Sequence, residues 1–151
     1  MVGDGNNLAN SWLTAAMRFP FNFILACPKG YEPDESIVAA ADAAGASFVI
    51  THDPLEAVQG AHVIYGDVWT SMGQEGEASQ RLARFEGFQI NDELLSTVDS
   101  RCIVLHCLPA HRGEEITDEV MDGPRSIVFD QAENRLHMQK AILVKLLRSG
   151  A

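Results

Sequence analysis

The chain has 151 residues, of which 46% are hydrophobic and 21% charged, and its formal net charge is −10. This length suffices for one domain with a buried core, and the composition is that of a globular protein rather than a disordered one. A surface this negative repels nucleic-acid backbones and anionic lipid headgroups, so we expect neither nucleic-acid nor membrane binding. No membrane-spanning run or signal peptide is visible, and three cysteines are too few for a disulfide framework, so we expect free thiols in the cytoplasm.

The first recognisable elements lie between residues 21 and 50. A strand is predicted over residues 21–27, where an apolar run ends at a proline. A helix is predicted over residues 33–46, with Asp34 as its N-cap and Gly45 beyond its last turn. A second strand is predicted over residues 47–50.

The middle of the chain continues this alternation. A short helix is predicted over residues 53–60, because Asp53 suits the N-cap and Pro54 the first helical position. A strand over residues 62–67 and a helix over residues 76–88 follow.

The last third contains the most apolar strand and the longest helix. A helix is predicted over residues 91–98 with Asn91 as its cap, followed by a strand over residues 101–109. A short strand is predicted over residues 126–129 and a long final helix over residues 132–149.

Apolar strands separated by helices indicate a parallel sheet covered on both faces, so we predict a single α/β domain over residues 1–151. The expected architecture is a doubly wound, three-layer αβα sandwich. Only Met1 and Val2 precede the glycine-rich stretch, which in this architecture follows a strand, so the first strand is predicted to be truncated and the chain to be part of something longer. Ligands bind at the carboxyl ends of such strands, which points to three loops: residues 3–7, 67–73 and 106–112.

The first loop, "GDGNN", contains two of the glycines of a dinucleotide fingerprint. Gly3 and Gly5 match its start, but the third glycine is missing and no acid ends the next strand to hold a ribose. One interpretation is that Asn6 or Asn7 simply caps the following helix. The other is that the amide of Asn7 holds a small zwitterion at the helix N-terminus.

The second loop, "DVWTSMGQE", begins where a strand ends. Asp67 and Ser71 lie four residues apart on a turn, where together they could bind an ammonium and a carboxylate, and Gly73 permits close approach of a ligand. The alternative is a turn that begins at Asp67 and leads into a helix through Glu75.

The third loop follows the most apolar strand. Cys107 is either an inert packing residue or a base or hydrogen-bond partner for a substrate amine, the latter if nearby charge lowers its pKa. A metal site formed by His106, Cys107 and His111 fits no recognised zinc spacing, so no metal is predicted.

Arg135 lies near the predicted start of the final helix, where the helix dipole disfavours a cation. A cation at that end indicates an anionic partner, and a planar guanidinium suits a phosphate or a carboxylate. The alternative is a solvated arginine.

Four separated segments, "GDGNN", "DVWTSMGQE", "HCLP" and "AENR", occur in an order and at spacings that resemble the ornithine carbamoyltransferase family. The resemblance runs from about residue 2 to residue 147 and covers that family's second, amino-acid-binding half. The first half's Ser-Thr-Arg-Thr and His-Pro-x-Gln motifs are absent from the sequence. The resemblance implies a Rossmann-like sheet and, for the complete enzyme, a trimer.

The resemblance also implies roles for individual residues. Ornithine would be held at its amino-acid end by Asn7, Asp67, Ser71 and Met72. Carbamoyl phosphate would be bound by Cys107, Leu108 and Arg135. Asp67, Cys107 and Arg135 would be the catalytic residues, with the thiol near the δ-amine.

The implied reaction is the attack of the δ-amine of L-ornithine on carbamoyl phosphate, which gives L-citrulline and phosphate without a metal or organic cofactor. We expect the chain alone to be inactive, because a separate N-terminal domain would bring the carbamoyl phosphate. The helix at residues 131–148 would pack on that domain, and without it would favour self-association. A nucleotide-binding Rossmann module and a non-catalytic amino-acid-binding fragment remain as alternatives.

Overall fold

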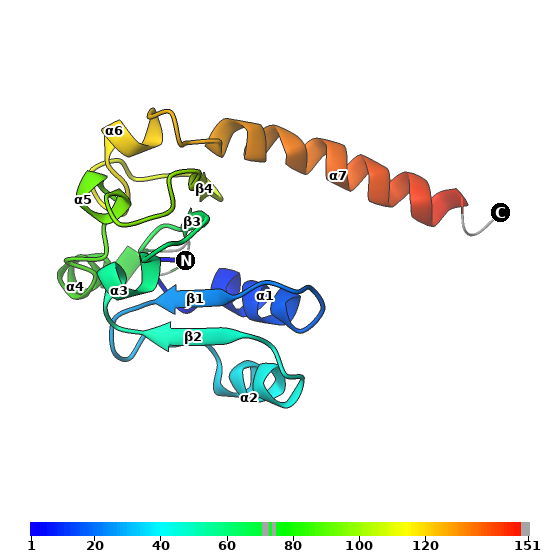
Figure 1. Cartoon of the computed structure of the whole chain (residues 1–151), viewed down its shortest axis with the longest axis horizontal. Coiled ribbons are helices and arrows are strands. Elements are labelled where there is room, and N and C mark those ends of the chain that lie inside the picture. Colours follow the sequence, from blue (N-terminus) through cyan, green and yellow to red (C-terminus); the bar gives the residue numbers. More distant parts are fainter. Residues whose placement is uncertain (71–72, 74, 149–151) are drawn as a thin grey trace.

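The computed structural model describes residues 1–70, 73 and 75–148 (Figure 1). The strands are β1 (Phe23–Ala26), β2 (Phe48–Thr51), β3 (Val63–Gly66) and β4 (Ile103–His106). The helices are α1 (Asn7–Ala16), α2 (Glu35–Ala43), α3 (Pro54–Val58), the 3-10 turn η1 (Glu75–Glu77), α4 (Ala78–Arg84), α5 (Asp92–Leu95), α6 (Asp118–Met121) and α7 (Val128–Arg148).

A single residue, Val2, joins the two halves of the sheet. Strands β1 and β2 pair in parallel, as do β3 and β4. Val2 forms parallel bridges to both Ala26 and Gly66, and its N–H donates to the carbonyl of Tyr65 at 3.1 Å. The spatial order is therefore β2, β1, Val2, β3, β4. In this order Val2 alone occupies the central position of the sheet, and a topological switch point lies beside it.

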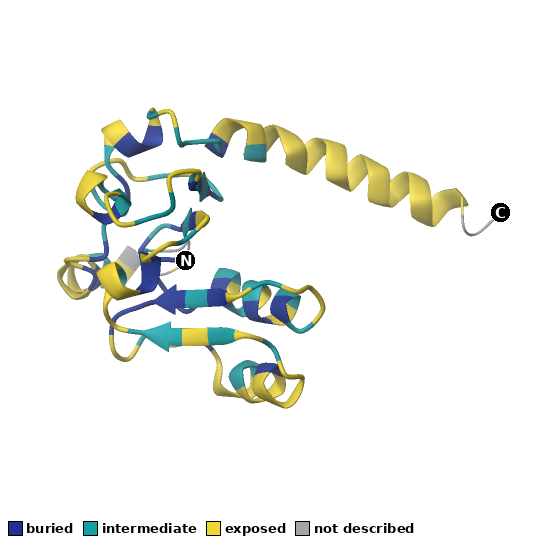
Figure 2. Ribbon diagram, viewed as in Figure 1, coloured by how far each residue is buried: buried dark blue, intermediate teal, exposed yellow. Residues whose placement is uncertain are grey.

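The two faces of the sheet are covered by different helices, which gives the predicted three layers. One buried cluster joins β1 to α1 and α2 and includes Leu13, Phe23, Leu25 and Ala41. The other joins β3 and β4 to α3, α5 and α6 and includes Val58, Ile64, Leu94, Val104 and Val120. Buried segments therefore run through the centre of the body on both sides of the strands (Figure 2).

Local sequence signals set several helix boundaries. Asp34, Asp53 and Asn91 cap α2, α3 and α5, and each accepts a hydrogen bond from a backbone N–H two or three residues further on. Gly45 follows α2 with a φ of +70°, the left-handed conformation that glycine adopts without a Cβ clash. These three caps and this helix end are where the sequence predicted them.

Two expectations about elements are wrong. The strand predicted over residues 126–129 is reduced to one bridge, between Ser126 and Val104, and α7 begins at Val128. The reason is that the backbone of Ile127 completes its pairing with Val104 and the chain then turns directly into the helix. Helix α6 was not predicted at all, because its four residues are too few for a periodic pattern.

The long helix α7 leaves the body after its first turn (Figures 1 and 2). Val128 is buried at its start, whereas residues 132–148 are all exposed. Large apolar side chains are among them: Leu136, Met138, Ile142, Leu143, Val144, Leu146 and Leu147. Across the described residues, no helix is both long enough and apolar enough to cross a membrane.

Candidate active site

The three predicted loops meet at the carboxyl edge of the sheet. The first follows Val2 and the second follows Gly66, and these two residues are bridged, so the loops leave the sheet side by side. A Cβ placed on Gly3 would lie 3.7 Å from the carbonyl oxygen of Asp67, which shows that the first and second loops touch. Cys107 brings the third loop against the second.

The contact between Cys107 and Asp67 is the centre of the site. The Cys107 thiol donates a hydrogen bond to Oδ1 of Asp67 across 2.8 Å, and Asp67 is buried. The same Oδ1 accepts the backbone N–H of Val68 at 2.9 Å, which fixes the orientation of the carboxylate. Two residues that are forty positions apart in the sequence are thus held together by strand pairing.

The environment of Cys107 raises its pKa. Burial raises the pKa of this thiol to about 12, and the hydrogen bond to Asp67 and the negative charge of Asp67 act in the same direction. The idea that nearby charge lowers the pKa of Cys107 is therefore wrong, because the closest charge is an anion. At neutral pH Cys107 is a protonated hydrogen-bond donor and not a base.

Leu108 adopts a conformation unusual for its residue type. Its φ is +57°, in the left-handed region, which costs a residue with a Cβ about 1 kcal/mol or more. Its N–H donates to Nδ1 of His106 across 3.0 Å, and the peptide bond from Leu108 to Pro109 is cis. The chain therefore makes a sharp, hydrogen-bonded turn immediately after Cys107.

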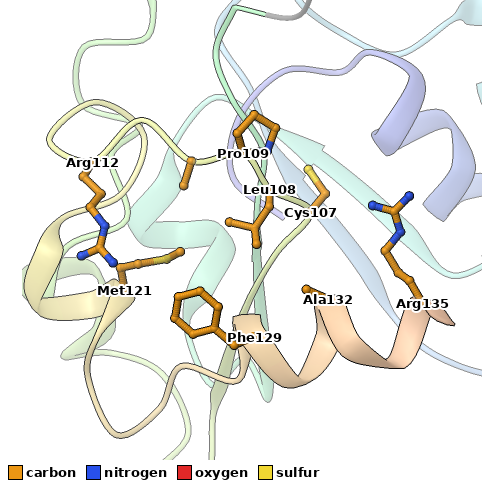
Figure 3. A pocket seen from close by; sticks show the side chains of 9 residues that line it. Cys107, Leu108, Pro109, Arg112, Met121, Phe129, Ala132 and Arg135 are labelled. Atoms are coloured by element: carbon orange, nitrogen blue, oxygen red, sulfur yellow. The ribbon is translucent and has the colours of Figure 1, made fainter. Parts of the chain in front are cut away.

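An open cavity of about 640 Å³ lies between this turn and the first turns of α7. Cys107, Leu108 and Arg135 line it together, with Phe129 and Met121 on its apolar side (Figure 3). The three residues that the family resemblance assigned to carbamoyl phosphate thus share one surface.

The two arginines that line the cavity differ in their surroundings. Arg112 forms ion pairs with Asp118 and Asp122, at 2.7 and 2.6 Å respectively. Arg135 is exposed on α7 on the same side of the cavity as Cys107 (Figure 3). Because α7 begins at Val128, Arg135 lies two turns inside the helix, and the argument from the helix dipole is wrong.

Gln131, which sequence reasoning missed, ties the start of α7 to the sheet. Its side-chain carbonyl accepts the backbone N–H of His106 at 3.0 Å, and its amide donates to the hydroxyl of Tyr65 at 2.7 Å. Gln131 therefore fixes Arg135, one turn further along, relative to Cys107. This anchoring role cannot be recognised from a single sequence, because a glutamine on a polar helix face is common and has no distinctive spacing.

The remaining predicted ligand residues are less completely placed. Asn7 is the first residue of α1 and is exposed, while the cap is Asn6, whose side chain accepts the N–H of Leu8 at 3.2 Å. The interpretation of Asn7 as the cap is therefore wrong, although Asn6 was the stated alternative. Ser71 and Met72 lie outside the described residues.

The glycine-rich loop packs against the chain itself. A Cβ on Gly5 would lie 2.4 Å from the carbonyl oxygen of Tyr31 and 2.5 Å from the backbone nitrogen of Pro33, and the N–H of Gly5 donates to Tyr31 at 2.9 Å. In a dinucleotide site, a glycine here makes room for the pyrophosphate. In this protein the backbone of residues 31–33 occupies that room, which removes the main support for a nucleotide site.

A buried ion pair that sequence reasoning also missed connects the first two loops. Arg81 of α4 pairs with Asp4 and donates through Nε to the carbonyl of Trp69. Its guanidinium carbon lies 4.8 Å from the ring centre of Tyr31 and 5.3 Å from that of Phe85. Burial raises the pKa of Asp4, and the charge of Arg81 opposes this shift. The partners are too far apart in sequence for any spacing rule to link them.

One group of potential metal ligands lies beside the third loop. Ligand atoms of His111, Glu114 and Glu115 all fall within 4.8 Å of one another. His106 and Cys107 are not part of it, since Nδ1 of His106 accepts the N–H of Leu108 and the thiol faces Asp67. The combination of His106, Cys107 and His111 that the sequence offered is therefore not assembled.

Comparison with known proteins gives a consistent result. The family model described as "Aspartate/ornithine carbamoyltransferase, Asp/Orn binding domain" matches residues 1–146. The chain is 55% identical over 147 residues to the ornithine carbamoyltransferase of Chlorobaculum tepidum, covering 97% of this chain and 44% of that protein. It is 58% identical over 142 residues to that of Nitratidesulfovibrio vulgaris, covering 94% and 47%. The chain thus spans about half the length of the curated relatives it matches.

Solved structures agree in fold. The anabolic ornithine carbamoyltransferase of Campylobacter jejuni superposes with a TM-score of 0.92 at 36% identity, over 97% of this chain and 50% of that one. The ornithine carbamoyltransferase of Thermus thermophilus gives a TM-score of 0.83 at 51% identity, over 97% and 46%. The Rossmann-like α/β fold predicted from the sequence is confirmed.

Proposed function

Because this chain belongs to the aspartate/ornithine carbamoyltransferase family, we propose that it is the ornithine-binding half of an ornithine carbamoyltransferase. The complete enzyme would transfer the carbamoyl group of carbamoyl phosphate to the δ-amine of L-ornithine, giving L-citrulline and phosphate. The observation that carries this proposal is the hydrogen bond between Cys107 and Asp67, at the sheet edge beside a cavity that Arg135 also lines.

Asp67 supports ornithine over aspartate as the amino-acid substrate. Its buried carboxylate attracts an ammonium group and repels the second carboxylate of aspartate. In the proposed pose, the α-amino and α-carboxylate groups are held by Asn7, Asp67, Ser71 and Met72, with Met72 contributing mainly backbone. The side chain of ornithine then runs from this end toward Cys107.

The chemical step requires a neutral δ-amine. An alkylammonium of this type has a pKa near that of lysine, about 10, and a water-poor pocket lowers that pKa because burial disfavours the charged form. Cys107 does not take the proton, since its own pKa is raised to about 12, so its role is to hold Asp67 and contact the amine. The amine forms the new C–N bond to the carbamoyl carbon while the C–O bond to phosphate breaks, and the proton that the nitrogen then loses passes to the departing phosphate.

Arg135 is proposed to bind the phosphate of carbamoyl phosphate. It lines the cavity with Cys107 and Leu108, and a guanidinium matches a phosphate in charge and geometry. The proposed reaction proceeds by nucleophilic attack and loss of phosphate, and we propose that it requires no metal or organic cofactor.

Helix α7 is proposed to pack on the domain that binds carbamoyl phosphate. Its side chains Leu143, Leu146 and Leu147 are 58%, 65% and 76% exposed, a contiguous apolar surface that is costly in water. In a complete enzyme, proposed to be a cytoplasmic homotrimer, that domain would cover this surface and close the active site.

Titration of the chain with L-ornithine, L-aspartate and NAD tests the proposed substrate class. We expect weak, saturable heat changes by calorimetry for ornithine and none for the other two ligands, and Asp67→Asn should abolish the ornithine signal. The matched control is Asp53→Asn, since Asp53 caps α3, a role that asparagine also fills, and does not line the cavity. Binding of NAD with no response to ornithine would overturn the proposal in favour of a nucleotide site.

A citrulline assay tests the reaction. The chain alone should form little or no citrulline, and addition of a carbamoyl phosphate domain from a homologous enzyme should produce turnover. Strong activity of the chain by itself would contradict the proposed division of labour between the two halves.

A further inference from the structure

A buried pair of side chains, His106 and Glu115, lies directly behind the Cys107 turn. Both are about 1% exposed, and Nε2 of His106 is 3.3 Å from Oε1 of Glu115. His106 ends β4, whereas Glu115 comes from the loop before α6. The Nε2–Oε1 contact is close but poorly aligned for a hydrogen bond, and Oε2 of Glu115 is buried without a partner among the described residues.

Each member of the pair holds one end of the segment 108–111. Nδ1 of His106 accepts the N–H of Leu108 at 3.0 Å, at the residue whose φ is +57°. Oε1 of Glu115 accepts the N–H of His111 at 2.6 Å. The two side chains and their mutual contact therefore form a continuous support beneath the turn, from its first residue to its last.

The imidazole of His106 also lies against the second loop. A Cβ on Gly66 would come within 2.9 Å of Cδ2 of His106, so the ring rests on the backbone of the residue that precedes Asp67. The charge of Glu115 is one of the smaller influences that raise the pKa of Cys107. The His106 ring therefore contacts two backbone positions: Leu108, which follows Cys107, and Gly66, which precedes Asp67.

We propose that His106 and Glu115 are positioning residues that fix the Leu108 turn, and hence its backbone carbonyl, at the carbamoyl-binding end of the site. This inference rests on the proposed function for the purpose of the turn, but not for its mechanical support. Because Nδ1 of His106 accepts a hydrogen bond, the ring proton resides on Nε2, facing Glu115. The carboxylate of Glu115, 3.3 Å from Nε2, favours this tautomer electrostatically, although the two atoms are not aligned as a hydrogen bond.

Amide hydrogen exchange of the chain, followed by NMR, tests this support without any substrate. In Glu115→Ala the N–H of His111 should exchange about tenfold faster, the effect of losing one hydrogen bond, while the N–H of Ala26 in β1 changes far less. Glu115→Gln keeps an acceptor oxygen and should restore slow exchange at His111. The matched control is Glu86→Ala, at an exposed glutamate in the turn after α4, which should alter neither amide.

Equal acceleration at His111 and Ala26 would mean that the pair only stabilises the fold, and unchanged exchange at His111 would mean that it holds nothing; either result overturns the proposal. Should Glu115→Ala fail to fold, the ¹⁵N shifts of the His106 ring in the unaltered chain decide. A protonated Nε2 and an unprotonated Nδ1 are expected, and the opposite tautomer would overturn the proposal.

Activity with a complementing domain gives the functional readout. His106→Ala should lower kcat at least about tenfold with a much smaller change in KM for ornithine, because positioning acts on the reacting geometry. His106→Asn, whose side-chain oxygen can replace Nδ1 as acceptor, should recover part of the loss. A rise in KM for ornithine at constant kcat would contradict this role. If no citrulline forms in any assay, the proposed function fails, but the amide exchange of His111 still tests whether His106 and Glu115 support the turn. The two proposals can therefore be rejected independently.

Discussion

At the scale of single residues, the pairing of a thiol with a carboxylate decides what Cys107 can do. A cysteine at a ligand edge suggests a nucleophile or a base, yet the neighbour at 2.8 Å is an anion, and the thiol retains its proton. The sequence indicated which two residues matter but not the direction of the pKa shift. That direction depends on burial and on the carboxylate beside the thiol, and neither effect can be read from spacing.

The raised pKa of Cys107 predicts slow alkylation. In Asp67→Asn the negative charge is lost while an acceptor oxygen remains, so the pKa should fall and the rate of reaction with iodoacetamide at about pH 8 should rise roughly tenfold. Peptide mapping by mass spectrometry gives the rate for each cysteine. Cys27, also held near a pKa of about 12 by burial, serves as the internal reference and should not change. An unaltered rate at Cys107 would show that Asp67 does not control this thiol.

Glycine substitutions test whether the first loop is shaped by packing. Gly5→Ala places a methyl group 2.4 Å from the carbonyl oxygen of Tyr31 and should lower the free energy of unfolding by about 3 kcal/mol or more. Gly76→Ala is the control, since nothing lies within 4 Å of its Cβ position and its φ is not positive. Urea denaturation measures both. Equal effects would mean that the close approach of residues 31–33 is relieved at little cost.

At the scale of secondary-structure elements, the sequence predicted what local chemistry determines. The caps Asp34, Asp53 and Asn91 were recognisable because each needs only a polar side chain two or three residues before a helical N–H. The Asp4–Arg81 pair was not recognisable, because it forms only after α4 packs against the first loop. The strand predicted at Ser126 also depends on tertiary pairing that the sequence does not show. Only one bridge, to Val104, forms there before α7 begins.

Helix α7 is the element whose exposed face has the clearest consequence. Replacing Leu143 and Leu147 by glutamate should reduce self-association of the chain without lowering its melting temperature, because both side chains are exposed on α7, which extends away from the body (Figure 1). Sedimentation velocity over a range of concentrations measures the association. The control is Lys140→Glu on the same helix, which changes charge but removes no apolar surface. A monomeric parent chain would contradict the expectation of self-association.

At the scale of the whole molecule, burial of weak acids links stability to alkaline pH. Burial raises the pKa of Cys27, Tyr65 and Cys107 to about 12 in the folded chain. The unfolded chain loses these protons at lower pH, so it binds fewer protons than the folded chain between about pH 9 and 12. Stability from these groups is therefore fully present below their unfolded pKa values and is lost as pH rises.

The free energy of unfolding should accordingly fall steeply from about pH 9 upward. The slope of the unfolding free energy against pH measures how many more protons the folded chain binds than the unfolded chain. Cys107→Ala should lower this difference by about one proton. Cys102→Ala should lower it by less, because the pKa of Cys102 is raised less. Urea denaturation at several pH values measures the slope. A Cys107→Ala slope identical to that of the parent chain would mean that this thiol ionises alike in both states.

The hydrogen bonds of Gln131 fix one end of α7 beside the cavity that Cys107 and Arg135 line. The helix has 21 residues and reaches about 31 Å, while its root is bonded to His106 and Tyr65. Because these bonds hold the root of the helix, any displacement of its distal turns moves Arg135, one turn from Gln131, far less than it moves the end of the helix.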